Sequence, residues 1–310
     1  MGSYLSHTTP RRVVVDVQDP ELNPNEFPDD EAFSIIDSLN YSKNRLGYNP
    51  GEYFHAPVWH ISPNTVLKRT QSWPCETYTM MVVASSTSIP VPKVRKCVFR
   101  KGDVWTFMEY VDGPTLAEAW PTLSIWMKLW VAWKVRSYIS QLRRLTPSLP
   151  VPHIPGPKDG TENPRRCEGH FFTDIGTGPF SSYDELSAWY SKKADLAVYL
   201  HCERSAYLGE APSLSREKLH FDDSVPLVLT HGDISLRNLI LGKDGRLWLI
   251  DWGFSGVYPQ WLEYASMMAH SYKRGPEPKL WFWLTPFMAG WYNPQFLYLR
   301  SIGAALMSYN

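Results

Sequence analysis

The sequence predicts an α+β fold with two lobes, a small antiparallel β lobe with one helix followed by a larger, mainly helical lobe. Up to Asp112 the chain alternates short apolar runs with turn residues, in the order strand, strand, helix, strand, strand. After Asp112-Gly113-Pro114 long amphipathic segments dominate, above all Ile125 to Leu145. We therefore expect a polar N-terminal extension over residues 1–50, a β lobe over 51–112 and a helical lobe over 113–310.

Proline and turn residues in the sequence predict where the elements of the β lobe begin and end. Apolar runs broken at Pro57 and at Ser62-Pro63-Asn64 predict a hairpin whose second strand ends at Lys68. A helix with Glu76 in its first turn comes next, and Ile89-Pro90-Val91-Pro92 stops it. The predicted ranges are Glu31 to Leu39 for a helix in the extension, Thr65 to Lys68, Lys93 to Phe99 and Val104 to Tyr110 for strands, and Glu76 to Ala84 for the helix.

Composition excludes several classes of function. The 310 residues carry 31 Lys and Arg against 31 Asp and Glu, so no general attraction to nucleic acid is expected. The four cysteines are widely spaced and predict free thiols without a zinc site. The start of the chain has no apolar core of a signal peptide, and basic residues interrupt Ile125 to Leu145, which argues against stable membrane insertion. We expect a cytoplasmic monomer, since no heptad repeat stands out.

One stretch, Val228 to Phe254, carries residues suited to chemistry. It consists of an apolar run, a polar loop, and a predicted hairpin that runs into Asp251. Phosphoryl transfer needs a carboxylate beside the attacking hydroxyl and oxygen ligands that hold magnesium on the phosphates. Asp233 in the loop, Asn238 before the hairpin and Asp251 after it supply these groups in order.

This stretch resembles a known family. His231-Gly232-Asp233 through Asn238 is similar to the catalytic loop of aminoglycoside phosphotransferases and choline kinases, and Asp251-Trp252-Gly253 stands where protein kinases have Asp-Phe-Gly. The resemblance implies a bilobal protein-kinase-like fold that uses ATP and Mg²⁺. It makes Asp233 the catalytic base, Asn238 and Asp251 the magnesium ligands, and His231 an organiser of the loop. Thr87 to Pro92 and Val257 to Tyr264 look like the fungal branch of this family.

The resemblance extends to the β lobe. Lys68 looks like the family lysine that contacts the α- and β-phosphates, and Glu76 is its candidate ion-pair partner. An ordinary surface lysine and a helix-start glutamate are the alternative. The segment after the last strand implies a connector between lobes, in which the backbones of Glu109 and Val111 contact the adenine edge.

Two regions depart from the family pattern. We expect the loop over the phosphates at His55 to Asn64, which contains no glycine, although glycine favours close approach of backbone amides to phosphate. The tail after Glu263 is dense in aromatic residues, which either form lobe core or face the cleft as a substrate cage. An aromatic cleft would favour an apolar, aromatic or singly cationic acceptor over an aminoglycoside.

These features leave two hypotheses from different classes. The first is an ATP- and Mg²⁺-dependent O-phosphotransferase acting on a small-molecule hydroxyl. The second is a kinase-fold protein without kinase activity, either a binding scaffold or a biosynthetic enzyme that has repurposed the cleft. A protein kinase is disfavoured because Val257-Tyr258-Pro259 follows Gly253 almost at once, without an activation segment or an Ala-Pro-Glu element.

Overall fold

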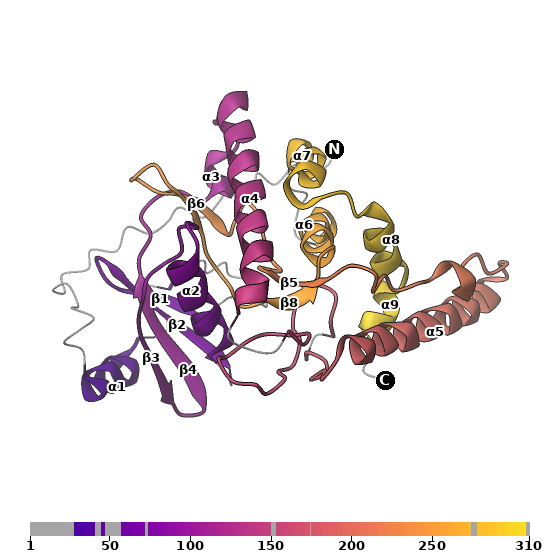
Figure 1. Ribbon diagram of the computed structural model, residues 1–310, viewed down its shortest axis with the longest axis horizontal. Helices are drawn as coiled ribbons and strands as arrows, with labels where there is room; N and C mark the ends of the chain where they lie inside the picture. Colours follow the sequence, from indigo (N-terminus) through magenta and orange to yellow (C-terminus); the bar gives the residue numbers. More distant parts are fainter. Residues whose placement is uncertain are drawn as a thin grey trace, which may run out of the picture.

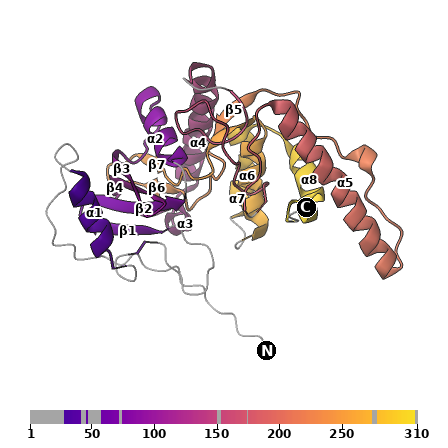
Figure 2. The ribbon, with the colours of Figure 1, turned by 90° about the horizontal axis from the view of Figure 1, so that it is seen from below.

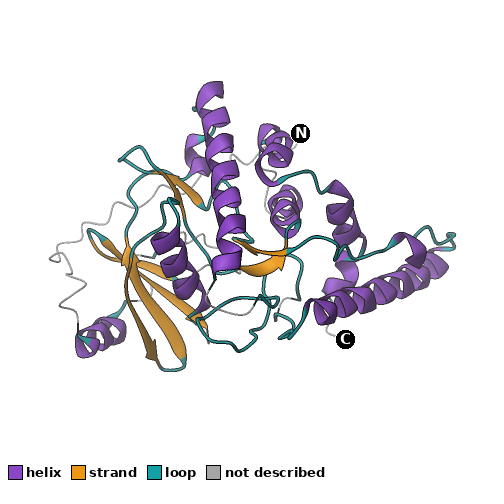
Figure 3. Ribbon diagram, in the orientation of Figure 1, coloured by secondary structure: helices purple, strands orange, loops and turns teal. Residues whose placement is uncertain are grey.

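A computed structural model describes residues 28–40, 45–46, 57–71, 74–149, 153–173, 175–273 and 278–307. The largest sheet lies at one side of the molecule and helices dominate the other side (Figure 1, Figure 3). Figure 2 shows helices α1 (Asp29–Ser38) and α5 (Tyr183–Leu208) at opposite ends of the molecule. The predicted α+β fold with two lobes is therefore confirmed.

The four-stranded sheet is antiparallel, with the strand order β1-β2-β4-β3. Its strands are β1 (Val58–Ser62), β2 (Thr65–Gln71), β3 (Val94–Arg100) and β4 (Asp103–Glu109). Both predicted hairpins are present. Strand β2 is longer than expected, however, because Arg69, Thr70 and Gln71 still find partners on β4. Lys68 consequently lies in the middle of a strand and not at its end.

Two helices cover opposite faces of this sheet. Successive strand residues point to opposite faces, and on β2 Val66 packs with Met80 and Val83 of helix α2 (Cys75–Ser86). The next residue, Leu67, joins a separate apolar cluster with Ala32 and Ile36 of α1. By the same alternation, Lys68 points to the face covered by α2.

The second lobe is mainly helical, as predicted. Its helices are α3 (Leu116–Ala119), α4 (Ile125–Leu145), α5, α6 (Leu262–Lys273), α7 (Lys279–Ala289), α8 (Asn293–Ser301) and α9 (Gly303–Leu306). Two small antiparallel pairs complete it, β5 (Leu227–Thr230) with β8 (Gly256–Pro259) and β6 (Leu239–Leu241) with β7 (Leu247–Leu249). Among the described helices, none is both long and apolar enough to cross a membrane.

Helix α4 forms the predicted amphipathic element and supports the β6–β7 hairpin. Ser124 caps its start by accepting the Met127 N–H, which satisfies a free amide of the first turn. Its buried residues recur at helical spacing: Val131, Ala132, Val135, Tyr138, Ile139, Leu142 and Leu145. The hydroxyl of Tyr138 donates to the Leu247 carbonyl at 2.7 Å, which ties β7 to the lobe core.

The connector between the lobes is bound to β6. Leu241 N–H donates to the Pro114 carbonyl and Lys243 N–H to the Asp112 carbonyl, each at 3.0 Å. Gly113 between them has φ +152°, and a Cβ there would lie 2.2 Å from the Leu241 carbonyl oxygen. Only glycine allows so close an approach, so this residue fixes how the connector crosses the hairpin.

Candidate active site

Lys68 lies between two carboxylates that come from different elements. Its Nζ is 2.6 Å from Glu76 Oε1 on α2 and 2.7 Å from Asp251 Oδ1, which follows β7. Burial by itself would lower the pKa of Lys68, but the charges of Asp251 and Glu76 raise it above its usual value. The ammonium group is therefore charged and held in place. The structure thus brings together three residues that the sequence predicted for one site.

Glu76 also holds the segment that carries Asp251. Its Oε1 accepts the backbone N–H of Trp252 at 3.1 Å, in addition to the ammonium of Lys68. Burial raises the pKa of Glu76, and the nearby ammonium opposes that shift. A single buried carboxylate therefore sets the position of the lysine and of the residue next to Asp251.

Asp251 has a left-handed backbone, with φ +64°, which is uncommon for a residue other than glycine. Its side chain remains 38% exposed although Lys68 contacts one oxygen. A strained backbone and an accessible carboxylate are typical of functional sites. The geometry leaves Asp251 able to ligate a cation that approaches from the solvent side.

The catalytic-loop segment leaves β5 through a turn that requires glycine. Gly232 has φ +78°, and a Cβ there would lie 2.5 Å from the Phe254 carbonyl oxygen. His231 beside it is fully buried. Its Nδ1 accepts the Asp233 N–H at 3.2 Å, and its Nε2 lies 3.1 Å from the Ile250 carbonyl. Burial lowers the pKa of His231 to about 4, so a neutral imidazole links this loop to the end of the hairpin.

Glu263 supports the same loop from α6. Its carboxylate accepts the backbone N–H of His231 at 2.7 Å and that of Gly232 at 3.2 Å. Burial raises the pKa of Glu263 to about 7, against the opposing effect of these two hydrogen bonds. The sequence showed Glu263 only as an acid in the tail. Its role depends on a contact across 32 residues, which no local pattern reveals.

Asn238 links the segment of Asp233 to the segment of Asp251. Its side-chain nitrogen donates to the Asp233 carbonyl at 2.9 Å and to Asp233 Oδ2 at 2.8 Å. Its own carbonyl accepts the N–H of Ile250, the residue before Asp251, at 3.0 Å. The β6–β7 register, with Leu239 opposite Leu249, therefore carries Asn238 and Asp251 to the same end of the hairpin. A carboxylate and an amide oxygen form a donor set that fits Mg²⁺.

Two histidines that the sequence did not single out contact Asp233. The Nε2 of His170, from the loop before α5, is 2.7 Å from Asp233 Oδ1, and the Nε2 of His270 on α6 is 2.8 Å from the same oxygen. Burial favours a raised pKa for Asp233, but His170 and His270 outweigh it and hold that pKa well below its usual range. His270 lies two turns after Glu263 on one helix face, the only sequence signal that could have indicated it.

The connector residues lie at the junction of the lobes. Glu109 donates its N–H to the Lys93 carbonyl at 2.9 Å, which leaves only its carbonyl for a predicted backbone contact with a nucleotide. Val111 is buried in a small apolar cluster with Ile240 and Trp248 of the β6–β7 hairpin. Both positions agree with a connector, while their contact with adenine stays a prediction.

The predicted loop over the phosphates was misplaced. Val58–Ser62 forms strand β1, because its residues pair with β2, and Asn64 in the following turn accepts the Tyr110 N–H of the connector at 2.9 Å. His55 and Ala56 of the predicted loop lie outside the described residues. The N–H of Leu46 donates to the Val58 carbonyl at 2.9 Å, so a segment upstream also pairs with β1. The sequence between Leu46 and Pro57 contains Gly47 and Gly51.

The aromatic residues of the tail divide between core and surface. Trp281, Phe296 and Tyr298 are buried, as the core interpretation predicts, whereas Trp283 and Trp291 are 75% and 67% exposed. Tyr309 lies outside the described residues. Near Asp233 the structure places a different ring, Phe254, which contacts His170 edge-on at 5.7 Å between ring centroids.

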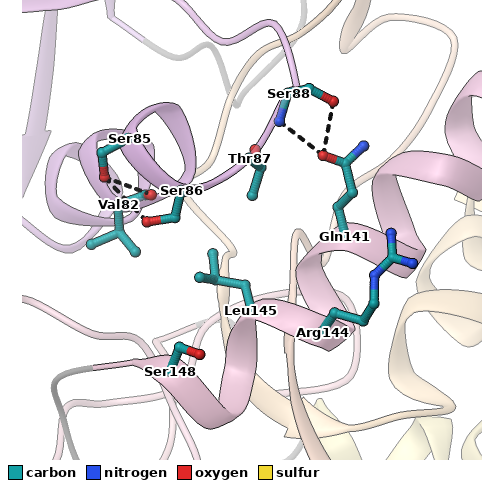
Figure 4. A pocket seen from close by; sticks show the side chains of 9 residues that line it. All are labelled: Val82, Ser85, Ser86, Thr87, Ser88, Gln141, Arg144, Leu145 and Ser148. Carbon is teal, nitrogen blue, oxygen red and sulfur yellow. Dashed lines mark hydrogen bonds between the residues drawn. The ribbon is translucent and has the colours of Figure 1, made fainter.

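A depression also lies between the end of α2 and the end of α4 (Figure 4). Its lining residues are Val82, Ser85, Ser86, Thr87, Ser88, Gln141, Arg144, Leu145 and Ser148. Glu76 lies at the opposite end of α2 from these serines. The depression is therefore separate from the site around Lys68.

The two lobes and the residues gathered at their junction agree with the arrangement that the sequence predicted. Residues 173–292 match the phosphotransferase enzyme family known as APH, and this stretch contains Asp233, Asn238 and Asp251. The family resemblance predicted from the catalytic-loop motif is thereby confirmed, whereas the fungal branch stays a prediction. Comparison with curated proteins gave no match.

Solved structures with a similar chain course include three phosphotransferases. An aminoglycoside-3'-phosphotransferase of type VIII has a TM-score of 0.49 and 16% identity, over 89% of this chain and 98% of its own. The phosphotransferase APH(3'')-Id from Streptomyces rimosus, in complex with ADP and streptomycin, has a TM-score of 0.45 and 15% identity, over 91% and 100%. Choline kinase LicA from Streptococcus pneumoniae has a TM-score of 0.42 and 14% identity, over 90% and 87%.

Proposed function

We propose that the protein is an ATP- and Mg²⁺-dependent O-phosphotransferase that acts on a hydroxyl group of a small molecule. The observation that carries this proposal is the contact of the buried Lys68 ammonium with Glu76 and Asp251, at 2.6 and 2.7 Å. Phosphoryl transfer relies on positioning and charge, and this arrangement joins a fixed cation to a metal-binding carboxylate. The family match over residues 173–292 supports the same conclusion.

Each site residue has a defined role in this proposal. Lys68 binds the α- and β-phosphates, and the backbones of Glu109 and Val111 hold the adenine edge. Asn238 and Asp251 would hold Mg²⁺, which neutralises charge on the β- and γ-phosphates when bound. Glu76 keeps Lys68 in position through their 2.6 Å contact.

Asp233 receives the proton of the acceptor hydroxyl and orients that hydroxyl. Its low pKa makes it a weak base, which suits a loose transition state in which little proton transfer is needed before the phosphoryl group moves. Asn238 fixes the carboxylate through Oδ2. The other oxygen, Oδ1, contacts the two histidines, so an acceptor hydroxyl that bonds to it has to displace them.

The acceptor is proposed to be an apolar, aromatic or singly cationic metabolite. Phe254 and His170 lie beside Asp233, and their rings suit a flat or apolar molecule better than a polycation. We further propose that the protein acts as a monomer in the cytoplasm. The four cysteines are free, as a reducing compartment would keep them.

A second candidate is a kinase-fold protein without kinase activity. One observation favours it: both imidazoles already contact the oxygen of Asp233 that an acceptor would need. Both candidates could bind a nucleotide, so nucleotide binding does not distinguish them. Phosphoryl transfer does, because only the first candidate carries it out.

The deciding experiment measures ATP consumption over a panel of hydroxyl-bearing metabolites, with the wild-type protein, Asp233→Asn and a control. Asp184→Asn changes an exposed acid on α5 and serves as that control. We expect turnover in the wild type and the control, and a loss of at least about 100-fold in Asp233→Asn with nucleotide binding kept. Equal turnover by Asp233→Asn would rule out its assigned role.

A further inference from the structure

The imidazoles of His170 and His270 lie against the carboxylate of Asp233, and the three residues come from different parts of the fold. His170 precedes α5, Asp233 follows β5, and His270 lies on α6. One ligand atom from each residue lies within 4.8 Å of the other two. The contacts converge on Asp233 Oδ1, with His170 Nε2 at 2.7 Å and His270 Nε2 at 2.8 Å.

The hydrogen bonds of the described residues account for His170 and Asp233 in this cluster but not for His270. The side chain of His270 is only 5% exposed, and its Nε2 lies 2.8 Å from Asp233 Oδ1 without making a well-aligned hydrogen bond among the described residues. A buried polar nitrogen without a well-aligned hydrogen bond costs free energy, and natural sites rarely leave one. An imidazole nitrogen buried beside a carboxylate oxygen and a second imidazole is the arrangement that a metal ion resolves.

We propose that His170, Asp233 and His270 form a binding site for a divalent transition-metal ion of the zinc type. Two imidazole nitrogens and one carboxylate oxygen are a ligand set that Zn²⁺ uses, with a fourth position left for water or another ligand. Mg²⁺ prefers oxygen ligands, so this site is distinct from the one at Asn238 and Asp251.

The geometry needs only a small adjustment to accept the ion. Tetrahedral Zn²⁺ with bonds near its usual lengths places neighbouring ligand atoms roughly 3.4 Å apart, so the imidazole nitrogens would retreat from Asp233 Oδ1 by about 0.6 to 0.7 Å. A small cavity beside His170, lined in part by Gly232, Leu262 and Ser266, leaves space for the movement of His170. Asn238 already orients the carboxylate through Oδ2, which is what a supporting residue does for a metal ligand.

Occupancy would also affect catalysis, and this consequence alone rests on the proposed function. An ion on Oδ1 of Asp233 takes the oxygen that the acceptor hydroxyl needs. Zinc would therefore inhibit phosphoryl transfer without displacing magnesium nucleotide from Lys68 and Asp251. The site would act as a metal-dependent brake.

The test titrates Zn²⁺ into chelator-treated full-length protein by calorimetry, with Mg²⁺ present in excess. We expect one Zn²⁺ per chain, and affinity reduced by more than about 100-fold in His170→Ala and in His270→Ala, because loss of mere supporting residues costs 10–100-fold. His220→Ala, an exposed histidine after α5, is the matched control and should bind as the wild type does.

Two further measurements keep the outcome decisive. The absorption spectrum of the Co²⁺-loaded protein reports tetrahedral nitrogen and oxygen ligation, and circular dichroism shows whether each variant is folded. His170 is less buried than His270, so the zinc affinity of His170→Ala can still be measured if His270→Ala fails to fold. Wild-type affinity no tighter than that of folded His170→Ala would overturn the site. No enzyme assay enters this test, so its failure is separable from failure of the proposed function.

Discussion

Asp233 and Glu263 are both carboxylic acids of this site, but their surroundings shift their pKa values in opposite directions. Asp233 contacts two histidines and an amide, which keep it ionised. Glu263 accepts two backbone N–H groups in a buried position, and burial raises its pKa to about 7. Asp233 is thus kept ionised, while Glu263 has a pKa near neutral pH and holds the loop that carries Asp233.

Glu263→Gln should alter the dependence of stability on pH. The pKa of Glu263 rises from its usual 4.5 to about 7, so the folded protein holds the proton more tightly than the unfolded chain does. Its contribution to the free energy of unfolding therefore falls as pH rises between these two values, by up to roughly 3 kcal/mol. The glutamine variant can still accept one backbone N–H but has no such titration.

Urea unfolding of both proteins from pH 4.5 to 8 measures the difference. His231, with a pKa lowered from 6.5 to about 4, makes stability rise with pH over an overlapping range. That effect is present in both proteins and cancels when they are subtracted. A difference between wild type and variant that stays constant with pH would contradict the assigned titration of Glu263.

At the residue scale, sequence reasoning found the groups that follow one another along the chain. Asp233, Asn238 and Asp251 sit on one loop and one hairpin, so their spacing alone predicts that they meet. His170 lies 63 residues from Asp233 in an irregular segment, and only the packing of separate elements brings it close. Glu263 and His270 were missed for the same reason.

At the scale of elements, the sequence located the strands of the β lobe, but it did not predict where β2 ends. Alternating apolar residues and turn signals located both hairpins of the β lobe. The end of β2 depends on the partners that β4 offers, which the sequence of β2 itself does not contain. A loop was predicted over His55 to Asn64, whereas Val58–Ser62 forms a strand that pairs with β2 and, at Leu46, upstream. Such pairing is a property of the sheet and not of any one strand.

The connector gives a test at the same scale. Gly113→Ala should destabilise the protein by about 1–3 kcal/mol, because alanine is strained at φ +152° and its Cβ would lie 2.2 Å from a carbonyl oxygen. Gly303→Ala in α9 is the control, since a Cβ there meets no atom within 4 Å. Urea unfolding compares the two variants. Equal stabilities would show that the connector can move away from β6.

At the scale of the whole molecule, the site lies where the lobes join. Lys68 and Glu76 of the β lobe contact Asp251 and Trp252 of the helical lobe, and Leu249 N–H donates to the Pro90 carbonyl at 2.9 Å. A ligand that contacts Lys68 and Asp251 together would add to these links. Nucleotide binding should therefore stabilise the molecule as a unit.

The measurement that tests the central claim most directly is thermal unfolding of the full chain with Mg²⁺-ATP, compared with Asp251→Asn. A ligand at a hundred times its dissociation constant adds about 2.7 kcal/mol to the free energy of unfolding. The wild type should gain this stabilisation only when Mg²⁺ and ATP are both present, and Asp251→Asn should lose most of it. No stabilisation of the wild type at millimolar Mg²⁺-ATP, or equal stabilisation of Asp251→Asn, would contradict a nucleotide and magnesium site at Lys68 and Asp251.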